Sequence, residues 1–401
     1  MIKRTLQELC LNITDGKHGD CENEENSGYY FISCKDIFDG QINYKNARQI
    51  TKADFEETHK RTMLEVDDIL LTNSGTIGRM AFVTDREATT KTTFQKSVAI
   101  IKPDKQKVLP RYLYYQLQNC VPQFINSSNG SAQKNLLLST MRTFQIEIEE
   151  NREKQEKIAN TLSAYDDLIE NNQKQIKLLE EAAQRLYKEW FVDLRFPGHE
   201  NTKIVNGVPE GWSKSTVSEV SAVLRRGISP KYNEKARGIV INQKCIRQTI
   251  VSYDEARTQE KKYPAELEMM ESDIVICSTG AGTLGRVGQI FEAKGNVTLD
   301  SHVTLIRANE KIGQQSLFWS LKMKQDYLMN AGKGSTNQLE LSRETIGSCE
   351  ILIPERKIAE QVEKNFVAIH NKMKECSMQI ARLREARDLL LPKLMSGEVE
   401  V

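Results

Sequence analysis

The sequence lacks any Cys-x-x-Cys pair, although it holds eight cysteines among its 401 residues. Cysteines scattered in this way fit neither a zinc-ligand set nor the disulfide framework of a small secreted domain. The five histidines also show no ligand spacing and no neighbouring pair of carboxylates at helical intervals. We therefore expect reduced, mostly buried thiols, with no metal site and no cofactor.

Long apolar runs are missing as well, since none approaches the roughly 18 residues that a membrane span needs. The first eight residues contain no stretch of signal-peptide character before acidic and amide side chains appear. The mean hydropathy of −0.52 is that of an ordinary soluble protein. These absences predict a cytoplasmic protein with no membrane partner.

An excess of charge of one sign is the third absence. The chain has 56 basic and 55 acidic residues, a formal net charge of +1. Overall charge therefore gives no argument for a nucleic-acid partner, and basic groups would have to be gathered on one face by folding.

Catalytic signatures are absent too. The sequence contains no Asn/Asp-Pro-Pro-Tyr/Phe motif of amino-methyltransferases, no Gly-x-Ser-x-Gly elbow, no His-Glu-x-x-His and no ATP loop of the helicase kind. We expect a protein that is not itself an enzyme.

What the chain does contain is one large internal repeat. Blocks of matching residues recur in the same order, roughly 200 positions apart, as repeat architectures require. The clearest are Asp68-Ile69-Leu70-Leu71 with Asp273-Ile274-Val275-Ile276, and Gly75-Thr76-Ile77-Gly78-Arg79 with Gly282-Thr283-Leu284-Gly285-Arg286. A chain of this length accommodates two or three domains, and the repeat favours two related ones.

Each repeat ends in a segment whose apolar residues alternate in steps of three and four, the a/d pattern of a coiled coil. In the first segment the seam includes Ile158, Leu162, Ile169, Asn172, Ile176 and Leu179. In the second it includes Phe366, Ile369, Met373, Cys376, Ile380 and Leu383. The remaining faces are charged, so we expect two long helices that pack on each other.

Proline and glycine mark the boundaries of these segments. Phe196-Pro197-Gly198 should stop the first helix, and Ile353-Pro354 should precede the second. Leu391-Pro392, together with Ser396-Gly397, should disrupt the end of the second helix. Short β-rich runs precede each helix, with shorter helical segments at 112–117 and 317–323. The predicted division is a domain over 1–149, a helix over 150–196, a domain over 197–353 and a helix over 354–401. The fold class is α+β, with two repeated α/β domains separated by two helices in an antiparallel coiled coil.

At this point the sequence resembles a known family. Residues 186–200, LYKEWFVDLRFPGHE, and 387–398, RDLLLPKLMSGE, are similar to the two conserved regions of type I restriction-modification specificity subunits. With the repeated Gly-Thr-x-Gly-Arg blocks, the resemblance covers essentially the whole chain. It implies two target recognition domains that read the two parts of a double-stranded DNA sequence. It further implies partnership with methyltransferase subunits, two copies of them, and with restriction subunits through the complex.

The repeated glycine loops admit more than one interpretation. Gly280-Ala281-Gly282-Thr283-Leu284-Gly285 is literally G-x-G-x-x-G, but a dinucleotide site needs a helix to follow, and the next residues favour a strand. A turn between strands is the simplest interpretation. The functional alternative is a loop that approaches DNA with Ser74, Thr76 and Arg79 in the first repeat and Thr283 and Arg286 in the second.

Two further sets of loops are candidate DNA contacts or plain surface turns. Polar, basic loops occur at the same place in both repeats and contribute Lys134, Lys333, Ser335 and Asn337; the spacing around Lys333 excludes a Walker ATP site. Basic segments also open the two domains and contribute Lys17, Arg225, Arg226 and Lys231.

Two other classes of protein remain alternatives. One is a nuclease or methyltransferase fused to its own recognition domain, which a catalytic block outside the repeat would favour. The other is a coiled-coil scaffold whose domains bind protein, which would lack the steep salt dependence of DNA binding. If the helices are antiparallel, Asn172 and Cys376 should fall near one layer, and seams of about 50 Å should set the distance between the two domains.

Overall fold

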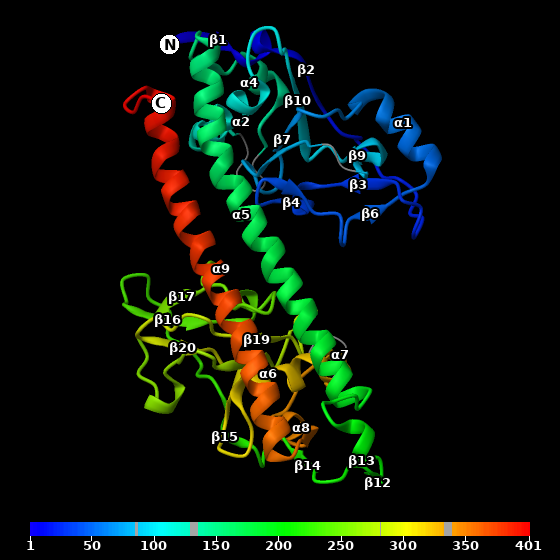
Figure 1. Ribbon diagram of the computed structural model, residues 1–401. Helices are drawn as coiled ribbons and strands as arrows, with labels where there is room; N and C mark the ends of the chain where they lie inside the picture. The colour runs from blue at the N-terminus through cyan, green and yellow to red at the C-terminus, as the bar shows by residue number, and fades with distance from the viewer. Residues whose placement is uncertain (85–86, 129–134, 281, 333–338) are drawn as a thin grey trace. The chain divides into compact units, whose positions relative to one another are not determined.

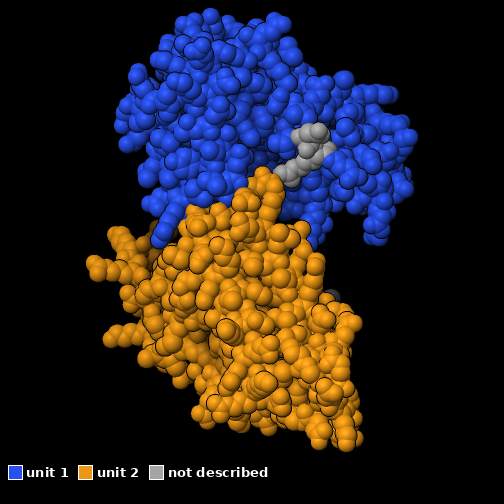
Figure 2. Space-filling model, viewed as in Figure 1, with its two compact units in different colours: residues 1–169, 381–401 blue, residues 170–380 orange. Residues whose placement is uncertain are grey.

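The protein is described by a computed structural model, which covers residues 1–84, 87–128, 135–280, 282–332 and 339–401. The chain divides into two compact units (Figure 2). Unit 1 consists of Met1–Ile169 and Ala381–Val401, and unit 2 of Glu170–Ile380.

Unit 1 is built on a four-stranded antiparallel sheet in the order β2-β10-β7-β8 (Figure 1). A three-stranded sheet, β6-β3-β9, lies beside it, and β3 pairs in parallel with β9. Two-stranded pairs join β1 to β11 and β4 to β5. The strands are β1 (Ile2–Thr5), β2 (Cys10–Asp15), β3 (Tyr30–Ile32), β4 (Ile37–Phe38), β5 (Gln41–Ile42), β6 (Arg48–Gln49), β7 (Ile69–Thr72), β8 (Met80–Phe82), β9 (Thr92–Phe94), β10 (Val98–Pro103) and β11 (Gln145–Ile148).

Unit 2 repeats this topology. Its four-stranded sheet has the order β15-β21-β18-β19, its three-stranded sheet has the order β17-β16-β20 with β16 parallel to β20, and β14 pairs with β22. These strands are β14 (Ser213–Thr216), β15 (Ser221–Arg226), β16 (Gly238–Ile241), β17 (Arg257–Gln259), β18 (Ile274–Cys277), β19 (Val287–Gln289), β20 (Val297–Leu299), β21 (Val303–Ala308) and β22 (Glu350–Ile353). A further hairpin pairs β12 (Ile204–Val205) with β13 (Val208–Pro209). The internal repeat of the sequence is therefore confirmed as a repeat of topology.

Short helices recur in the same positions. Unit 1 has α2 (Pro110–Asn119), α3 (Val121–Asn126) and α4 (Leu138–Thr143), and unit 2 has α6 (Gln314–Met323), α7 (Gln325–Asn330) and α8 (Arg343–Gly347). The two helical segments predicted at 112–117 and 317–323 are confirmed within α2 and α6. Helix α1 (Lys52–Thr62) belongs to unit 1 alone, because the corresponding residues 260–273 of unit 2 form only a short 3-10 turn, Ala265–Leu267.

The two long helices are α5 (Arg152–Tyr187), which a π turn extends through Val192, and α9 (Arg356–Ser396). The side chain of Asn151 caps the start of α5 by accepting hydrogen bonds from the backbone of Glu153 and Lys154. The helix ends before Phe196-Pro197, because Leu194 adopts a left-handed conformation with φ 55°.

The expected disruption at Pro392 is wrong, because α9 continues through it to Ser396. A proline this close to a helix end removes only one backbone hydrogen bond, and the next turn is held by Leu394 and Met395, which are buried in the core of unit 1. The part of the prediction that named Ser396-Gly397 is confirmed, because the helix ends at Ser396 and Gly397 follows with φ 76°.

In unit 1 the two helices run antiparallel. Arg387 donates a hydrogen bond to Asp166 across 2.6 Å, and Lys157 donates to the backbone oxygen of Val401 across 3.4 Å. The hydroxyl of Tyr115 on α2 donates to the other oxygen of Asp166, so the same carboxylate joins the globular part to both helices. In unit 2 the thiol of Cys376 contacts Gln175.

The seam residues lie on the buried faces of the helices. Ile158, Leu162, Ile169, Asn172, Phe366, Met373, Cys376 and Ile380 are buried, and Ile176, Leu179, Ile369 and Leu383 are half-buried. Ile158 and Leu162 share one apolar core with strands of unit 1, whereas Ala183, Val362 and Phe366 belong to the core of unit 2. Each helix is thus part of the core of both units. No helix in the described part of the chain is long and apolar enough to cross a membrane.

Candidate nucleic-acid interface

Loops from five parts of unit 1 converge at one end of the four-stranded sheet. The backbone of Asn73, at the end of β7, donates to Ser97 O and accepts from Leu136 N. The backbone of Lys17, at the end of β2, donates to Phe94 O, and the backbone of Cys34 donates to the Ser97 hydroxyl. We define the first loop cluster as residues 16–18, 34–36, 73–79, 95–97 and 135–136.

Unit 2 assembles the same cluster with the same backbone contacts. Ser278 donates to His302 O and accepts from Leu341 N, and Ile228 donates to Leu299 O. The side chain of Gln243 donates to Thr279 O, which ties in the 3-10 turn Gln243–Cys245. The second loop cluster comprises the described residues among 227–229, 243–245, 278–286, 300–302 and 340–341.

Glycine is needed where these loops cross. A Cβ at Gly16 would overlap the backbone of Phe94, and one at Gly227 would overlap the backbone of Leu299. Gly78 and Gly285, the last glycines of the repeated motif, have φ values of 95° and 75° and press against α3 and α7. The glycines of the motif therefore have a structural role, because they allow a tight loop between two antiparallel strands.

The arginine that follows each motif is available to a ligand. Arg79 is exposed and Arg286 is half-buried, and neither side chain forms a hydrogen bond or ion pair with any residue in the described ranges. Thr76 is exposed and Ser74 half-buried in the first loop. In the second loop, the hydroxyl of Thr283 donates to the backbone oxygens of Thr279 and Gly280. Exposed guanidinium groups on loops are suited to phosphate oxygens and to guanine edges.

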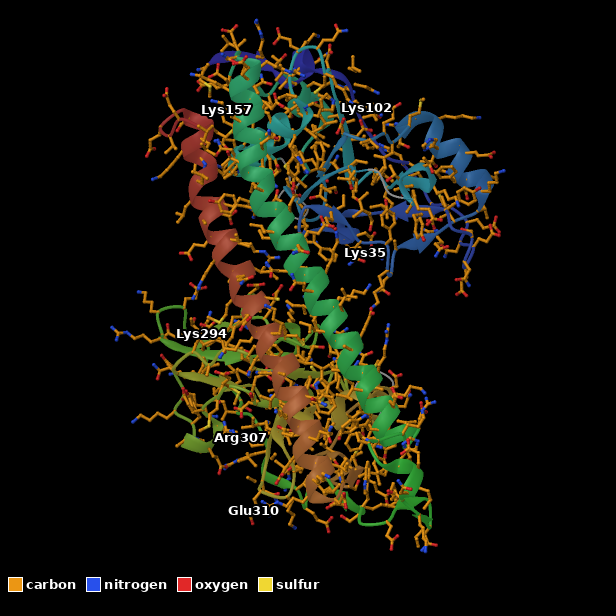
Figure 3. The ribbon with its side chains drawn as sticks, viewed as in Figure 1. Lys35, Lys102, Lys157, Lys294, Arg307 and Glu310 are labelled. Atoms are coloured by element: carbon orange, nitrogen blue, oxygen red, sulfur yellow. The ribbon has the colours of Figure 1, made fainter. Side chains whose placement is uncertain are left out.

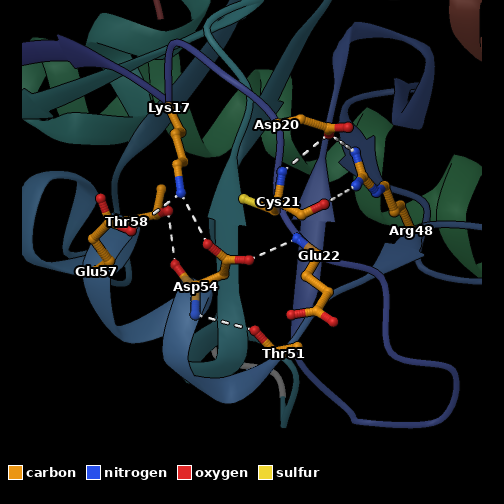
Figure 4. Close-up of polar contacts among 9 residues, drawn as sticks. All are labelled: Lys17, Asp20, Cys21, Glu22, Arg48, Thr51, Asp54, Glu57 and Thr58. Carbon is orange, nitrogen blue, oxygen red and sulfur yellow. Dashed lines mark hydrogen bonds and ion pairs between the residues drawn. The ribbon is translucent and has the colours of Figure 1, made fainter.

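The other charged candidates are neutralised by carboxylates of the same chain. Lys17 contacts Asp54 at 2.9 Å and Glu57 at 3.1 Å (Figure 4), and its hydrogen bond to Asp54 raises the pKa of its ammonium group. Lys231 is paired with Glu260, which raises its pKa in the same way.

Arg225 and Arg226 are also engaged. Arg225 pairs with Glu266, and Arg226 contacts Glu340 at 2.8 Å and Leu341 O at 2.9 Å. These two arginines, with Ile228 and Leu267, line a cleft of about 470 Å³ beside the second loop cluster. Lys134, Lys333, Ser335 and Asn337 lie outside the described residues.

The sequence reasoning missed two lysines at equivalent positions. Lys35 (Figure 3) and Lys244 are the second residues of the 3-10 turns that follow β3 and β16, and both are exposed. Their ammonium groups have no partner among the residues that the structure describes. One feature of the sequence could have identified them. In both copies a polar residue that caps a turn, Ser33 or Asn242, stands two positions before the lysine.

The glycine loops do not have the structure of a dinucleotide-binding site. Gly285 leads within two residues into strand β19, whereas the phosphates of a dinucleotide need the start of a helix. Within the described ranges, no group of three or more metal-binding side chains comes together. The arrangement can therefore bind through cationic and hydrogen-bonding side chains on loops.

Comparison with known proteins gives one consistent result. The sequence profile of the type I restriction modification DNA specificity domain matches residues 3–181 and again residues 209–375. The type I restriction enzyme MjaIX specificity subunit of Methanocaldococcus jannaschii is 27% identical over 394 residues, which covers 92% of this chain and 87% of that protein. The HindI specificity subunit of Haemophilus influenzae is 26% identical, covering 75% and 80%.

The fold has a counterpart among solved structures. A type I restriction-modification system S subunit from M. genitalium superposes with a TM-score of 0.55, covering 98% of this chain and 95% of the other at 17% identity. At that identity the likeness concerns the fold alone.

Proposed function

The chain belongs to the type I restriction modification DNA specificity family, and we propose that it is the DNA-recognition subunit of such a complex. In this role it selects the sequence, and partner subunits carry out methylation and cleavage. Each loop cluster reads one part of a two-part double-stranded DNA target.

The observation that carries this proposal is the duplication of a loop cluster that presents a free arginine. Arg79 and Arg286 occupy the same place in two copies of one topology, and neither side chain is paired with any residue that the structure describes. Lys35 and Lys244 add a second cation at an equivalent place in each cluster. Phosphate contacts from such groups give affinity, while contacts to base edges give sequence preference.

The two clusters differ enough to read different bases. At the end of β2 stands Asp15, and at the equivalent end of β15 stands Arg226, as the pairing with Ala99 and Thr304 defines. Both side chains are engaged within the chain, Asp15 with Arg61 and Arg226 with Glu340, so the two clusters are built differently at this shared position. The two parts of the target are therefore proposed to be unlike.

The partners proposed are methyltransferase subunits, in two copies, and restriction subunits that join through the complex. The number of copies is what the resemblance to specificity subunits implies, and the repeat supports it because two similar units offer two similar surfaces. For function we retain the division into recognition domains at 1–149 and 197–353 and helices at 150–196 and 354–401. Because the target is genomic DNA, we propose a cytoplasmic location.

The test is reconstitution with the methyltransferase subunit that partners this chain. The complex should bind a cognate duplex with an affinity that falls steeply with salt, and should transfer methyl groups from S-adenosylmethionine. The chain alone should transfer none. Methyl transfer by the isolated chain would favour the fused-enzyme alternative, and binding without a salt slope would favour a protein-binding scaffold.

A further inference from the structure

The two units differ in charge over one pair of equivalent segments. Residues 17–50 and 228–259 each run from the end of the first strand of the four-stranded sheet to the edge strand of the three-stranded sheet. The unit 1 segment has four basic residues (Lys17, Lys35, Lys45, Arg48) and six acidic residues (Asp20, Glu22, Glu24, Glu25, Asp36, Asp39). The unit 2 segment has six basic residues (Lys231, Lys235, Arg237, Lys244, Arg247, Arg257) and three acidic residues (Glu234, Asp254, Glu255).

Arg48 and Arg257 make the contrast specific, because they occupy the same register in β6 and β17. Arg48 pairs with Phe31 of β3, and Arg257 with Val240 of β16. The guanidinium of Arg48 donates to Asp20 and to the backbone oxygen of Cys21 (Figure 4), and its third nitrogen donates to Asn23. Its hydrogen bond also lowers the pKa of Asp20.

Arg257 is held quite differently. Its guanidinium lies 3.5 Å from the centroid of the Tyr232 ring. It forms no hydrogen bond or ion pair with the residues that the structure describes, and Tyr232 itself is 43% exposed. A guanidinium stacked on an exposed ring keeps its donors free and is fixed in orientation, which suits it to a phosphate.

Neighbouring residues extend this surface. Tyr232 lies against β17 through a bridge to Gln259, and the backbone of Glu260 donates to Lys231 O. The turn that follows presents Lys235 and Arg237, whose exposed side chains form no hydrogen bond or ion pair with the described residues. We call Tyr232, Lys235, Arg237 and Arg257 the basic edge of unit 2.

The basic edge is continuous with the second loop cluster. The ammonium group of Lys261 donates to Ser229 O across 2.9 Å, and Ile228 forms a parallel bridge with Asp300. The chain thus passes directly from loops of the cluster into the basic edge. Figure 1 shows β16, β17 and β20 of this sheet side by side.

We propose that the basic edge binds the phosphate backbone of double-stranded DNA flanking the part of the target that unit 2 reads. This inference rests on the proposed function and adds an asymmetry to it. Unit 2 supplies phosphate contacts that unit 1 lacks at the equivalent place, because there Lys17 and Arg48 are neutralised within unit 1. Unit 2 therefore contributes the larger share of the salt-dependent affinity.

The test compares variants of the reconstituted methyltransferase complex on its cognate duplex across a salt series. The edge variant carries Lys235→Gln, Arg237→Gln and Arg257→Gln. A matched control removes three exposed lysines of unit 2 elsewhere, with Lys203→Gln, Lys214→Gln and Lys311→Gln. Each lost phosphate contact should reduce the slope of log K against log salt by about 0.9.

The edge variant should lose up to about three such contacts, bind every duplex more weakly by a similar factor, and keep the methylated motif. The control should keep the wild-type slope. Phosphate ethylation interference should lose its signals only beside the part of the target assigned to unit 2. A wild-type slope in the edge variant, or an equal loss in the control, would overturn the inference. Absence of sequence preference in the wild-type complex would instead overturn the proposed function.

Discussion

The ammonium group of Lys102 (Figure 3) lies 2.8 Å from the buried carboxylate of Asp68, which directly precedes strand β7 of the four-stranded sheet of unit 1. Arg307 and Asp273 form the same pair in unit 2 at 2.6 Å. Both aspartates precede the second inner strand of their sheet, and both cations lie on the strand beside it. The repeat has thus kept a buried ion pair while exchanging lysine for arginine.

Breaking this pair should destabilise unit 1 strongly. Burial raises the pKa of Asp68 to about 6 even beside Lys102, so the charged carboxylate depends on its cation. Lys102→Met should lower the free energy of unfolding by about 3 kcal/mol, whereas Lys102→Arg should retain most of it. The control is Lys105→Met, which removes an exposed pair with Asp67 and should cost less than about 1 kcal/mol. Urea unfolding measures all three, and equal losses from Lys102→Met and Lys105→Met would contradict the account.

The free arginines should matter more for DNA than the paired ones. Arg79→Gln and Arg286→Gln should each weaken specific binding by about 1–3 kcal/mol, and each should relax only one part of the methylated motif. Arg225→Gln is the comparison, because Arg225 is exposed but already paired with Glu266. Fluorescence anisotropy on cognate duplexes gives the affinities. A larger loss for Arg225→Gln than for Arg286→Gln would contradict the claim that the unpaired arginines contribute more to DNA binding.

Stability should fall in mild acid because of His370. This side chain is buried between Gln289 and Phe291, and burial lowers its pKa to about 4. An unfolded histidine titrates near 6.5, so between these values only the unfolded chain binds the proton, and lowering the pH from about 6.5 to about 4 favours unfolding.

The measurement is the free energy of unfolding as a function of pH in wild type and in His370→Gln. The variant should lack a pH-dependent loss of up to about 3 kcal/mol over that window. Superimposable curves for wild type and His370→Gln would refute the assignment.

Helix length should set the spacing of the target. Because α5 is one helix with core residues of both units, four residues inserted near Asn172 extend it while approximately preserving the apolar stripe. The unspecified gap in the methylated motif should lengthen, with both specified parts unchanged. A gap of the original length would mean that the helices do not determine it.

The sequence predicted the duplicated parts well and the divergent parts poorly. The blocks around Asp68 and Asp273 could be matched from the sequence because both copies form the same buried strands. Residues 17–50 and 228–259 share little sequence, so neither the three-stranded sheets nor helix α1 could be read from the repeat. Whether Lys17 is free to bind DNA depends on its ion pair with Asp54, and the position of Asp54 is set by the packing of α1. The sequence therefore made Lys17 a candidate DNA contact, although its charge is neutralised within unit 1.

The most direct test of the central claim is methylome sequencing of cells that express this chain with its methyltransferase partner, before and after residues 1–149 are replaced by those of a relative. The account predicts a motif with two specified parts and an unspecified gap, in which the exchange alters one part and leaves the other intact. A continuous motif, or a change in both parts while the complex stays assembled, would contradict it.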